Sequence, residues 1–202
     1  MIKNIIFDLG GVIIDYNPEK TLAKYFDEAD CRTLLDCLFR NRLWTEMDRG
    51  VVSEEEALAA AKDKIPERHF EKVASIVHNW GDEMPPFEWM PEFIKKLKDN
   101  GYGIYLLSNA SYAFHEYSKK IPALSLFDGT VISADYHINK PDKGIYEALL
   151  NKYSLVAEEC FFIDDVAANI EGAAAVGIAG HIHSHTDMPA LCEALRRHGV
   201  NI

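Results

Sequence analysis

The sequence has few cysteines and little positive charge. Only four of its 202 residues are cysteine, and none of them lies in a Cys-x-x-Cys pair or in a Cys/His cluster with zinc-finger spacing. Scattered thiols in a chain of this length favour a reducing compartment over a disulfide framework. Lys and Arg total 21 against 32 Asp and Glu, a formal net charge of −11. This balance argues against binding to nucleic acid or to an anionic membrane, because clustered basic side chains hold both.

Long apolar runs are also missing. No segment approaches the roughly 18 consecutive apolar residues that a membrane-spanning helix needs. Residues 1–14 are apolar, but Asp8 interrupts them, and they lack the basic start and the cleavage site of a signal peptide. We therefore expect a cytoplasmic protein. With 48% apolar and 26% charged residues, the composition is that of a globular protein with one large domain, or one domain carrying an insertion.

The first part of the chain changes from a strand pattern to helical patterns. Residues 3–8 form a short apolar run that ends at Asp8 and is followed by Gly10-Gly11, which is typical of a buried strand and a turn. From residue 18 to about 82 the sequence contains four helical patterns and no convincing strand. Helices are expected to begin at Asn17-Pro18 and at a capping box over Ser53–Glu56.

After residue 84 strand and helix patterns alternate. We expect strands over 104–107, 130–132, 160–163 and about 178–183, helices over 91–100, 112–120, 142–153 and 188–198, and an Ala-rich helix that ends at 176. Such alternation is typical of a parallel sheet with helices on both faces. We therefore predict an α/β fold with a Rossmann-like core, residues 1–15 and 84–202. Residues 16–83 are predicted to form an all-helical cap inserted after the first strand.

Polar side chains stand where three of the predicted strands end. Asp8 follows the first strand, Ser108-Asn109 the second, and Asp164-Asp165 a later one. Ligands of parallel α/β sheets bind outside the carboxyl ends of the strands, so these groups are expected to meet. Carboxylates and backbone carbonyls suit Mg²⁺ held together with water and a substrate phosphate. One carboxylate can serve as a nucleophile, and Lys140 can neutralise charge that builds up during phosphoryl transfer.

Four segments resemble, in order, the motifs of the haloacid dehalogenase-like hydrolases. They are Phe7–Val12, Leu106–Asn109, Lys140-Pro141 and Phe162–Ile170. Each motif can occur by chance, whereas four in order at strand ends are specific, and the resemblance covers nearly the whole chain. The most similar subgroup includes the bacterial α-D-glucose-1-phosphate phosphatase, which shares an Arg-Gly-x-x-Ser turn like Arg49–Ser53.

The resemblance implies a role for each residue at the strand ends. The implied metal site consists of Asp8, the carbonyl of Gly10, Asp165 and Asp164, the last of which would orient Lys140 or a metal-bound water. Asp8 would also be the nucleophile. Ser108 and the backbone of Asn109 would hold the phosphoryl group, and Lys140 would pair with the nucleophile and the phosphate.

The implied activity is Mg²⁺-dependent hydrolysis of a small phosphorylated metabolite, with a sugar phosphate as the expected substrate, through an aspartyl-phosphate intermediate. The protein is expected to be a monomer or a dimer. One position departs from the commonest phosphatase pattern, because Gly10 stands where an Asp serves as general acid and base. Loss of such a group typically lowers the rate by about 10²–10⁴-fold. Two alternatives therefore stay open: a metal-free 2-haloacid dehalogenase, and a non-catalytic module that binds phosphorylated ligands.

Four residues in or near the predicted cap have both a functional and a structural interpretation. Asp15 could replace the missing acid, although a hinge or capping role is favoured. Trp44, Glu46 and Arg49 could face the substrate, although an aromatic residue at helical spacing is more often part of the core.

Three histidines near the end of the chain alternate along a predicted strand. His181, His183 and His185 would share one side of that strand and could together bind a transition metal. Nothing else in the sequence completes such a metal site. An exposed strand and loop is therefore the favoured interpretation.

Overall fold

Five parallel strands form a single sheet in the order β3-β2-β1-β4-β5. The computed structural model describes all residues, 1–202. The strands are β1 (Asn4–Phe7), β2 (Gly103–Ser108), β3 (Gly129–Ile132), β4 (Cys160–Asp164) and β5 (Ala179–Ile182). Strand β1 lies at the centre, and its last residue, Phe7, is level with Leu106 of β2 and Ile163 of β4. The predicted parallel α/β fold is confirmed, and the residues that follow these three strands share one edge of the sheet.

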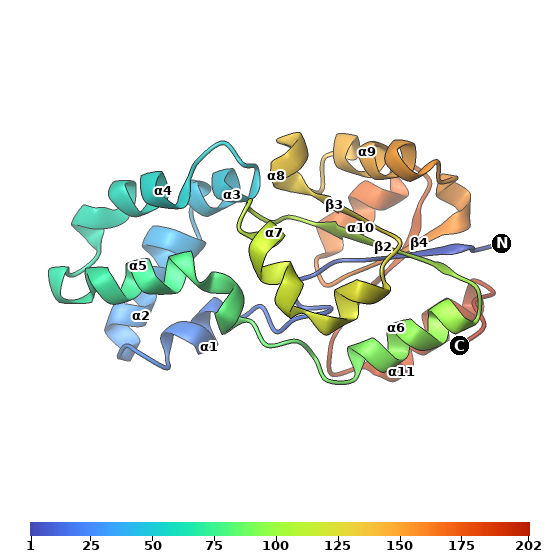
Figure 1. Cartoon of the computed structure of the whole chain (residues 1–202), viewed down its shortest axis with the longest axis horizontal. Helices are drawn as coiled ribbons and strands as arrows, with labels where there is room; N and C mark the ends of the chain where they lie inside the picture. The colour runs from blue at the N-terminus through green and yellow to red at the C-terminus, as the bar shows by residue number, and fades with distance from the viewer.

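Helices cover both faces of the sheet, which is why its central strands are continuously apolar. Ile5 and Phe7 face a hydrophobic cluster that includes side chains of α6 (Met90–Asp99) and α11 (Met188–Arg197). Ile6 points the other way, toward α9 (Lys143–Tyr153) and α10 (Ala167–Ala174). Figure 1 shows the two pairs of helices on opposite sides of the strands. The short helices α7 (Phe114–Tyr117) and α8 (Ser133–Tyr136) follow β2 and β3.

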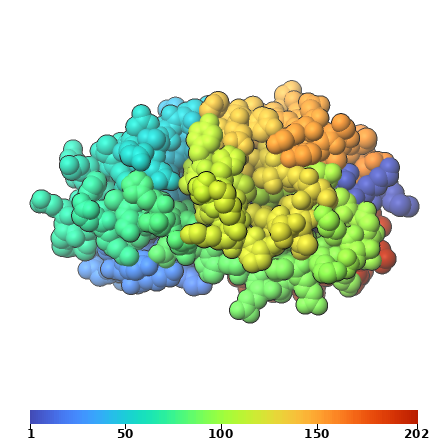
Figure 2. All heavy atoms as spheres, in the orientation of Figure 1, coloured from blue at the N-terminus to red at the C-terminus, as the bar shows by residue number.

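Residues 18–83 contain helices and no strand, and we call them the helical segment. Its α-helices are α1 (Pro18–Leu22), α2 (Glu28–Leu34), α3 (Arg42–Asp48), α4 (Glu54–Ala61) and α5 (Phe70–His78). A π-helical turn covers Leu35–Phe39, and 3₁₀ turns cover Lys62–Lys64, Glu67–His69 and Trp80–Glu83. The segment lies beyond the carboxyl ends of the strands (Figure 1). In the space-filling view its side chains meet those of the yellow-green stretch around α7 (Figure 2).

Two antiparallel stretches connect the helical segment to the sheet. Ile14 bridges to Pro86, and the Asp15 N–H donates to the carbonyl of Pro85 at 2.9 Å. Leu22 and Val77 of the helical segment belong to the same hydrophobic cluster as β1. The helical segment and the sheet therefore share one core.

Both predicted helix starts are confirmed. The side chain of Asn17 accepts a hydrogen bond from the Lys20 N–H at 2.9 Å, and Pro18 occupies the first position of α1. At the start of α4 the Glu56 N–H donates to Ser53 Oγ at 3.1 Å, and the Ser53 N–H donates to the Glu56 carboxylate at 2.8 Å. No helix in the protein combines the length and the apolar character needed to cross a bilayer.

Candidate active site

Three carboxylates meet at the carboxyl edge of the sheet. Asp8 follows β1, Asp164 ends β4, and Asp165 comes next, so the parallel pairing of β1 with β4 brings them side by side. One oxygen from each residue lies within 4.8 Å of the others. Carboxylate oxygens at this spacing can hold one divalent cation such as Mg²⁺.

A buried lysine joins two of these carboxylates. Lys140 is 4% exposed, and its Nζ lies 2.7 Å from Asp8 Oδ1 and 2.7 Å from Asp164 Oδ2. The same ammonium donates to the carbonyl of Leu107 at 3.1 Å. The ammonium group thus contacts three oxygen atoms and donates hydrogen bonds to those of Asp164 and Leu107. The structure therefore brings the predicted lysine to the predicted nucleophile although they lie far apart in the sequence.

The cluster carries more negative than positive charge, because three carboxylates face one ammonium. Burial raises the pKa of Asp8 to about 7, with Asp164 and Asp165 adding to the effect and Lys140 opposing it. Burial alone would lower the pKa of Lys140, but Asp8 and Asp164 raise it. A divalent cation would compensate the surplus charge, and hard oxygen donors are its preferred ligands. The residues of this edge therefore fit Mg²⁺.

The carboxylate of Asp164 accepts hydrogen bonds from several neighbouring groups. Its carboxylate accepts hydrogen bonds from the Val166 N–H at 2.8 Å and from Asn169 Nδ2 at 3.0 Å on each oxygen. With Lys140 as a further donor, about four acceptor positions of the carboxylate are filled. This geometry favours orientation of Lys140 over direct metal ligation by Asp164.

The side chain of Asn109 forms two hydrogen bonds with the backbone of Lys140. The Lys140 N–H donates to Asn109 Oδ1 at 2.8 Å, and Asn109 Nδ2 donates to the Lys140 carbonyl at 3.1 Å. Its side chain is thus engaged in placing Lys140, a function that the sequence does not reveal. Ser108 is buried at the end of β2 and lines the same cavity as Asp8.

The glycine turn after β1 passes close to Asp165. Gly11 has φ +70°, and a Cβ at this position would lie 2.3 Å from Asp165 Oδ2. Only glycine combines that backbone conformation with so close an approach. A Cβ on Gly10 would lie 3.2 Å from the Cβ of Tyr16, so Tyr16 packs over the position where the common phosphatase pattern has its acid.

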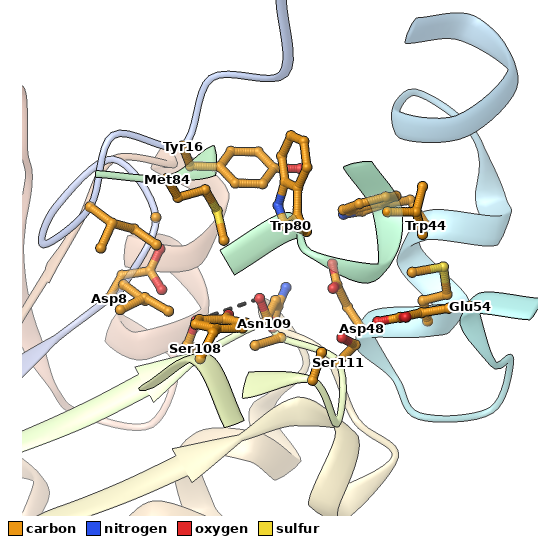
Figure 3. A pocket seen from close by; sticks show the side chains of 18 of the residues that line it. Asp8, Tyr16, Trp44, Asp48, Glu54, Trp80, Met84, Ser108, Asn109 and Ser111 are labelled. Atoms are coloured by element: carbon orange, nitrogen blue, oxygen red, sulfur yellow. Dashed lines mark hydrogen bonds between the residues drawn. The ribbon is translucent and has the colours of Figure 1, made fainter. Parts of the chain in front are cut away.

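A cavity of about 290 Å³ opens between this edge and the helical segment. Asp8, Ser108 and Asn109 line one end, and Trp44 and Asp48 of α3 line the other (Figure 3). Burial raises the pKa of Asp48 to about 7, and the charge of Asp8 adds to the effect. Nothing local in the sequence distinguishes Asp48 from a solvated helix residue, so its place in the cavity follows only from the fold.

Of the four candidate residues in or near the predicted cap, one lines the cavity and three lie outside it. Trp44 lines the cavity and also packs against Phe39. Glu46 and Arg49 do not line it and form an ion pair with each other at 3.0 Å. Asp15 pairs with Lys20 at 2.6 Å outside the cavity, beside the antiparallel connection to the sheet.

The three histidines do not gather into a site. His185 is exposed and stacks on Phe87 with ring centroids 5.1 Å apart, whereas His183 is 3% exposed and packs against Trp89. The favoured exposed loop is therefore wrong for His183. The pairing of β5 with β4 continues past Ile182, because the His183 N–H donates to the Asp164 carbonyl at 2.8 Å. The cluster of side chains close enough together to hold a metal ion consists of Asp8, Asp164 and Asp165 and contains no histidine.

The fold and this edge of the sheet together define a Rossmann-like hydrolase. The chain belongs to the haloacid dehalogenase-like hydrolase family, whose model matches residues 2–177. The predicted family is thus confirmed.

Curated relatives of the chain include phosphatases. The chain is similar to a sesquiterpene phosphatase of Aspergillus oryzae, with 29% identity over 96% of this chain and 95% of the relative. It is also similar to a D-ribitol-5-phosphate phosphatase of Bacteroides thetaiotaomicron, with 28% identity over 84% of this chain and 86% of the relative.

Solved structures share the fold. A HAD-like family hydrolase from Porphyromonas gingivalis is 24% identical, with a TM-score of 0.75 over 97% of this chain and 98% of that one. A HAD family enzyme from Bacteroides thetaiotaomicron, solved with magnesium and inorganic phosphate, is 20% identical, with a TM-score of 0.72 over 95% of this chain and 99% of that one.

Proposed function

We propose that the protein is a Mg²⁺-dependent phosphatase that hydrolyses a small phosphate monoester through a phospho-Asp8 intermediate. The observation that carries this proposal is the Asp8 carboxylate held at 2.7 Å by a buried Lys140, with Asp165 beside it. The names of the relatives support the reaction and differ in the alcohol, since they include a sesquiterpene, a ribitol and a carbohydrate phosphatase.

In the proposed reaction Lys140 occupies Oδ1 of Asp8 and leaves Oδ2 to attack phosphorus. The bond from phosphorus to the ester oxygen breaks, and Asp8 becomes an acyl phosphate. Water then attacks that phosphorus, which releases inorganic phosphate and restores the carboxylate. Lys140 and Ser108 would stabilise the phosphoryl oxygens in both steps.

Mg²⁺, held by Asp8, the Gly10 carbonyl and Asp165, would neutralise charge on the phosphoryl group when bound. The helical segment, together with the two residues before it, would act as the cap, residues 16–83, over a core of residues 1–15 and 84–202. Its closure would exclude bulk water from the cavity during the reaction.

The leaving oxygen needs a proton that Gly10 cannot supply. Asp48 faces the same cavity from the helical segment and has no ion-pair partner. We assign it the role of acid, and then of base toward the attacking water. This assignment favours turnover over the non-catalytic alternative.

Phosphate release from purified protein tests the function. With Mg²⁺, p-nitrophenyl phosphate, acetyl phosphate and a panel of phosphate monoesters should release phosphate, and EDTA should stop the release. Asp8→Asn should abolish it, because the amide is a poor nucleophile, while Asp15→Asn outside the cavity should keep wild-type activity. Phosphate release by Asp8→Asn at the wild-type rate would show the assignment to be wrong. Halide release from 2-chloropropionate in EDTA would favour the dehalogenase alternative.

A further inference from the structure

The part of the cavity wall that lies outside the edge of the sheet is predominantly apolar, although Asp48 and Glu54 also line it. Its buried lining residues come from the first connection, from the helical segment and from the segment that follows it: Ile14, Trp44, Met47, Val77, Trp80 and Met84. In Figure 3 the rings of Tyr16 and Trp80 lie across the cavity from Ser108 and Asn109. A phosphate bound near Asp8 would direct its ester group toward this apolar wall.

The aromatic part of the wall is rigidly supported. The Phe39 ring packs against Trp44 at a centroid distance of 4.3 Å and against Trp80 at 4.7 Å, while Tyr16 meets Trp80 edge-on at 5.8 Å. Rings held in this way need little reorganisation when a ligand binds, so apolar contact with them favours binding at low entropic cost.

The cavity offers little to a charged or polyhydroxylated group. No Lys, Arg or His is among its lining residues. Glu54 is engaged with His78 Nδ1 at 2.8 Å, which leaves Asp48 as the unpaired carboxyl group of the helical segment that faces the cavity. A second anionic group would therefore find no counter-ion, and the sugar hydroxyls that face the apolar side chains of the wall would lose hydrogen bonds to water without replacement.

One polar atom of the wall lacks a partner. Trp80 is 7% exposed, and its Nε1 donates no hydrogen bond to the protein. Figure 3 shows this nitrogen on the cavity side of the ring. A buried donor without a partner costs free energy unless a ligand satisfies it, so one acceptor on the ligand fits here.

We infer that the substrate is the phosphate monoester of an uncharged, predominantly apolar alcohol with at most one additional polar group. The inference rests on the proposed function and narrows its substrate class. It departs from the sugar phosphate expected from the sequence, because the groups that select the alcohol come from helices whose placement only the fold reveals.

A homologous series of esters tests this inference quantitatively. Ethyl, n-butyl and n-hexyl phosphate and glucose 6-phosphate are all esters of primary alcohols, so their intrinsic reactivities are similar. We expect kcat/KM to rise about fourfold per methylene, which corresponds to about 0.8 kcal/mol for each buried CH₂, until the cavity is full. n-Hexyl phosphate should exceed glucose 6-phosphate by at least roughly 100-fold. A flat series, or a preference for glucose 6-phosphate, would overturn the inference and leave the phosphatase assignment intact.

A matched pair of variants locates the effect in the cavity. Val77 and Val73 are both buried valines of α5, but only Val77 lines the cavity. Val77→Thr should lower the ratio of kcat/KM for n-hexyl phosphate to kcat/KM for glucose 6-phosphate about fivefold, whereas Val73→Thr should preserve that ratio. An equal effect of the two variants on that ratio would count against the inference.

Binding separates failure of the inference from failure of the function. If no ester is hydrolysed, the proposed phosphatase activity is refuted, and the same comparison is made with dissociation constants from tryptophan fluorescence of the Asp8→Asn variant. Tighter binding of n-hexyl phosphate than of glucose 6-phosphate would support the apolar site. Equal binding would overturn it.

Discussion

Replacing Lys140 by methionine is expected to destabilise the fold and to stop turnover. Methionine has a similar length and no charge, so the change removes the ammonium with little effect on packing. The ammonium is buried and contacts Asp8, Asp164 and the Leu107 carbonyl at 2.7, 2.7 and 3.1 Å. Without it, two buried carboxylates face each other with no counter-charge.

Removal of one partner from a buried ion pair typically costs about 3–5 kcal/mol. That is about a third of the free energy of unfolding of an ordinary domain. The loss of unfolding free energy caused by Lys140→Met should grow with pH, because proton binding is linked to folding. A carboxyl group whose folded pKa is raised binds its proton more tightly in the folded state, and this stabilisation is lost as pH rises through the folded pKa. Asp8 already has a pKa raised to about 7 with Lys140 present.

Urea denaturation followed by tryptophan fluorescence, at pH 5.5 and pH 8.0, measures the effect. Lys140→Met should lose about 3–5 kcal/mol at pH 8.0 and clearly less at pH 5.5, and Mg²⁺ should restore part of the loss. Lys143→Met is the matched control, because that side chain is 74% exposed and should matter little. A Lys140→Met variant within 1 kcal/mol of wild type at pH 8.0 would refute the view of Lys140 as the charge that holds this edge together.

Three further predictions concern the acid, the glycine turn and the buried histidine. Asp48→Asn should lower the single-turnover rate of alcohol release from n-hexyl phosphate by about 10²–10⁴-fold and that of nitrophenolate release from p-nitrophenyl phosphate by less than about tenfold, since a good leaving group needs no acid. Equal losses in this first step would remove Asp48 from the role of acid. Gly11→Ala should raise the Mg²⁺ concentration for half-maximal activity, because its Cβ would displace Asp165. Gly101→Ala is the control: Gly101 has φ +89° and no atom within 4 Å of an added Cβ, so this variant carries similar backbone strain and should leave that Mg²⁺ concentration unchanged. Burial lowers the pKa of His183 to about 4. The free energy of unfolding should therefore fall by about 2–3 kcal/mol between pH 7 and 4.5, because the unfolded chain takes up a proton near pH 6.5 and the folded chain does not. In urea denaturation, His183→Leu should abolish this part of the decrease in stability at acid pH.

Local sequence signals placed much of the fold correctly. The strand that ends at Asp8 and the strand that ends at Asp164 were recognisable as apolar runs that stop at a carboxylate. Asn17 and Ser53 marked the first residues of α1 and α4 through hydrogen bonds to residues three positions away. These signals succeed because the interactions they describe lie within one turn of helix or one strand.

The cavity wall was beyond the reach of such signals. Asp48 and Trp80 are ordinary members of helical patterns, and only the packing of the helical segment on the sheet turns them toward Asp8. The sequence predicts that the backbone of Asn109 holds the phosphoryl group. Only the fold shows the two hydrogen bonds between the Asn109 side chain and the backbone of Lys140. The burial of His183 depends on its contact with Trp89, a residue far away in the sequence, and no local pattern predicts that contact.

Strand patterns and the order of the motifs are enough to predict the parallel α/β architecture, the family, and the set of residues at the strand ends, because strand direction and motif order dictate which groups share an edge. Tertiary structure decided how these groups interact: Lys140 between two carboxylates, Asp164 saturated by donors, and Gly11 against Asp165. It also decided what faces them across the cavity. Contacts between the helical segment and the sheet join residues far apart in the chain, and no local pattern encodes the orientation that makes this wall apolar.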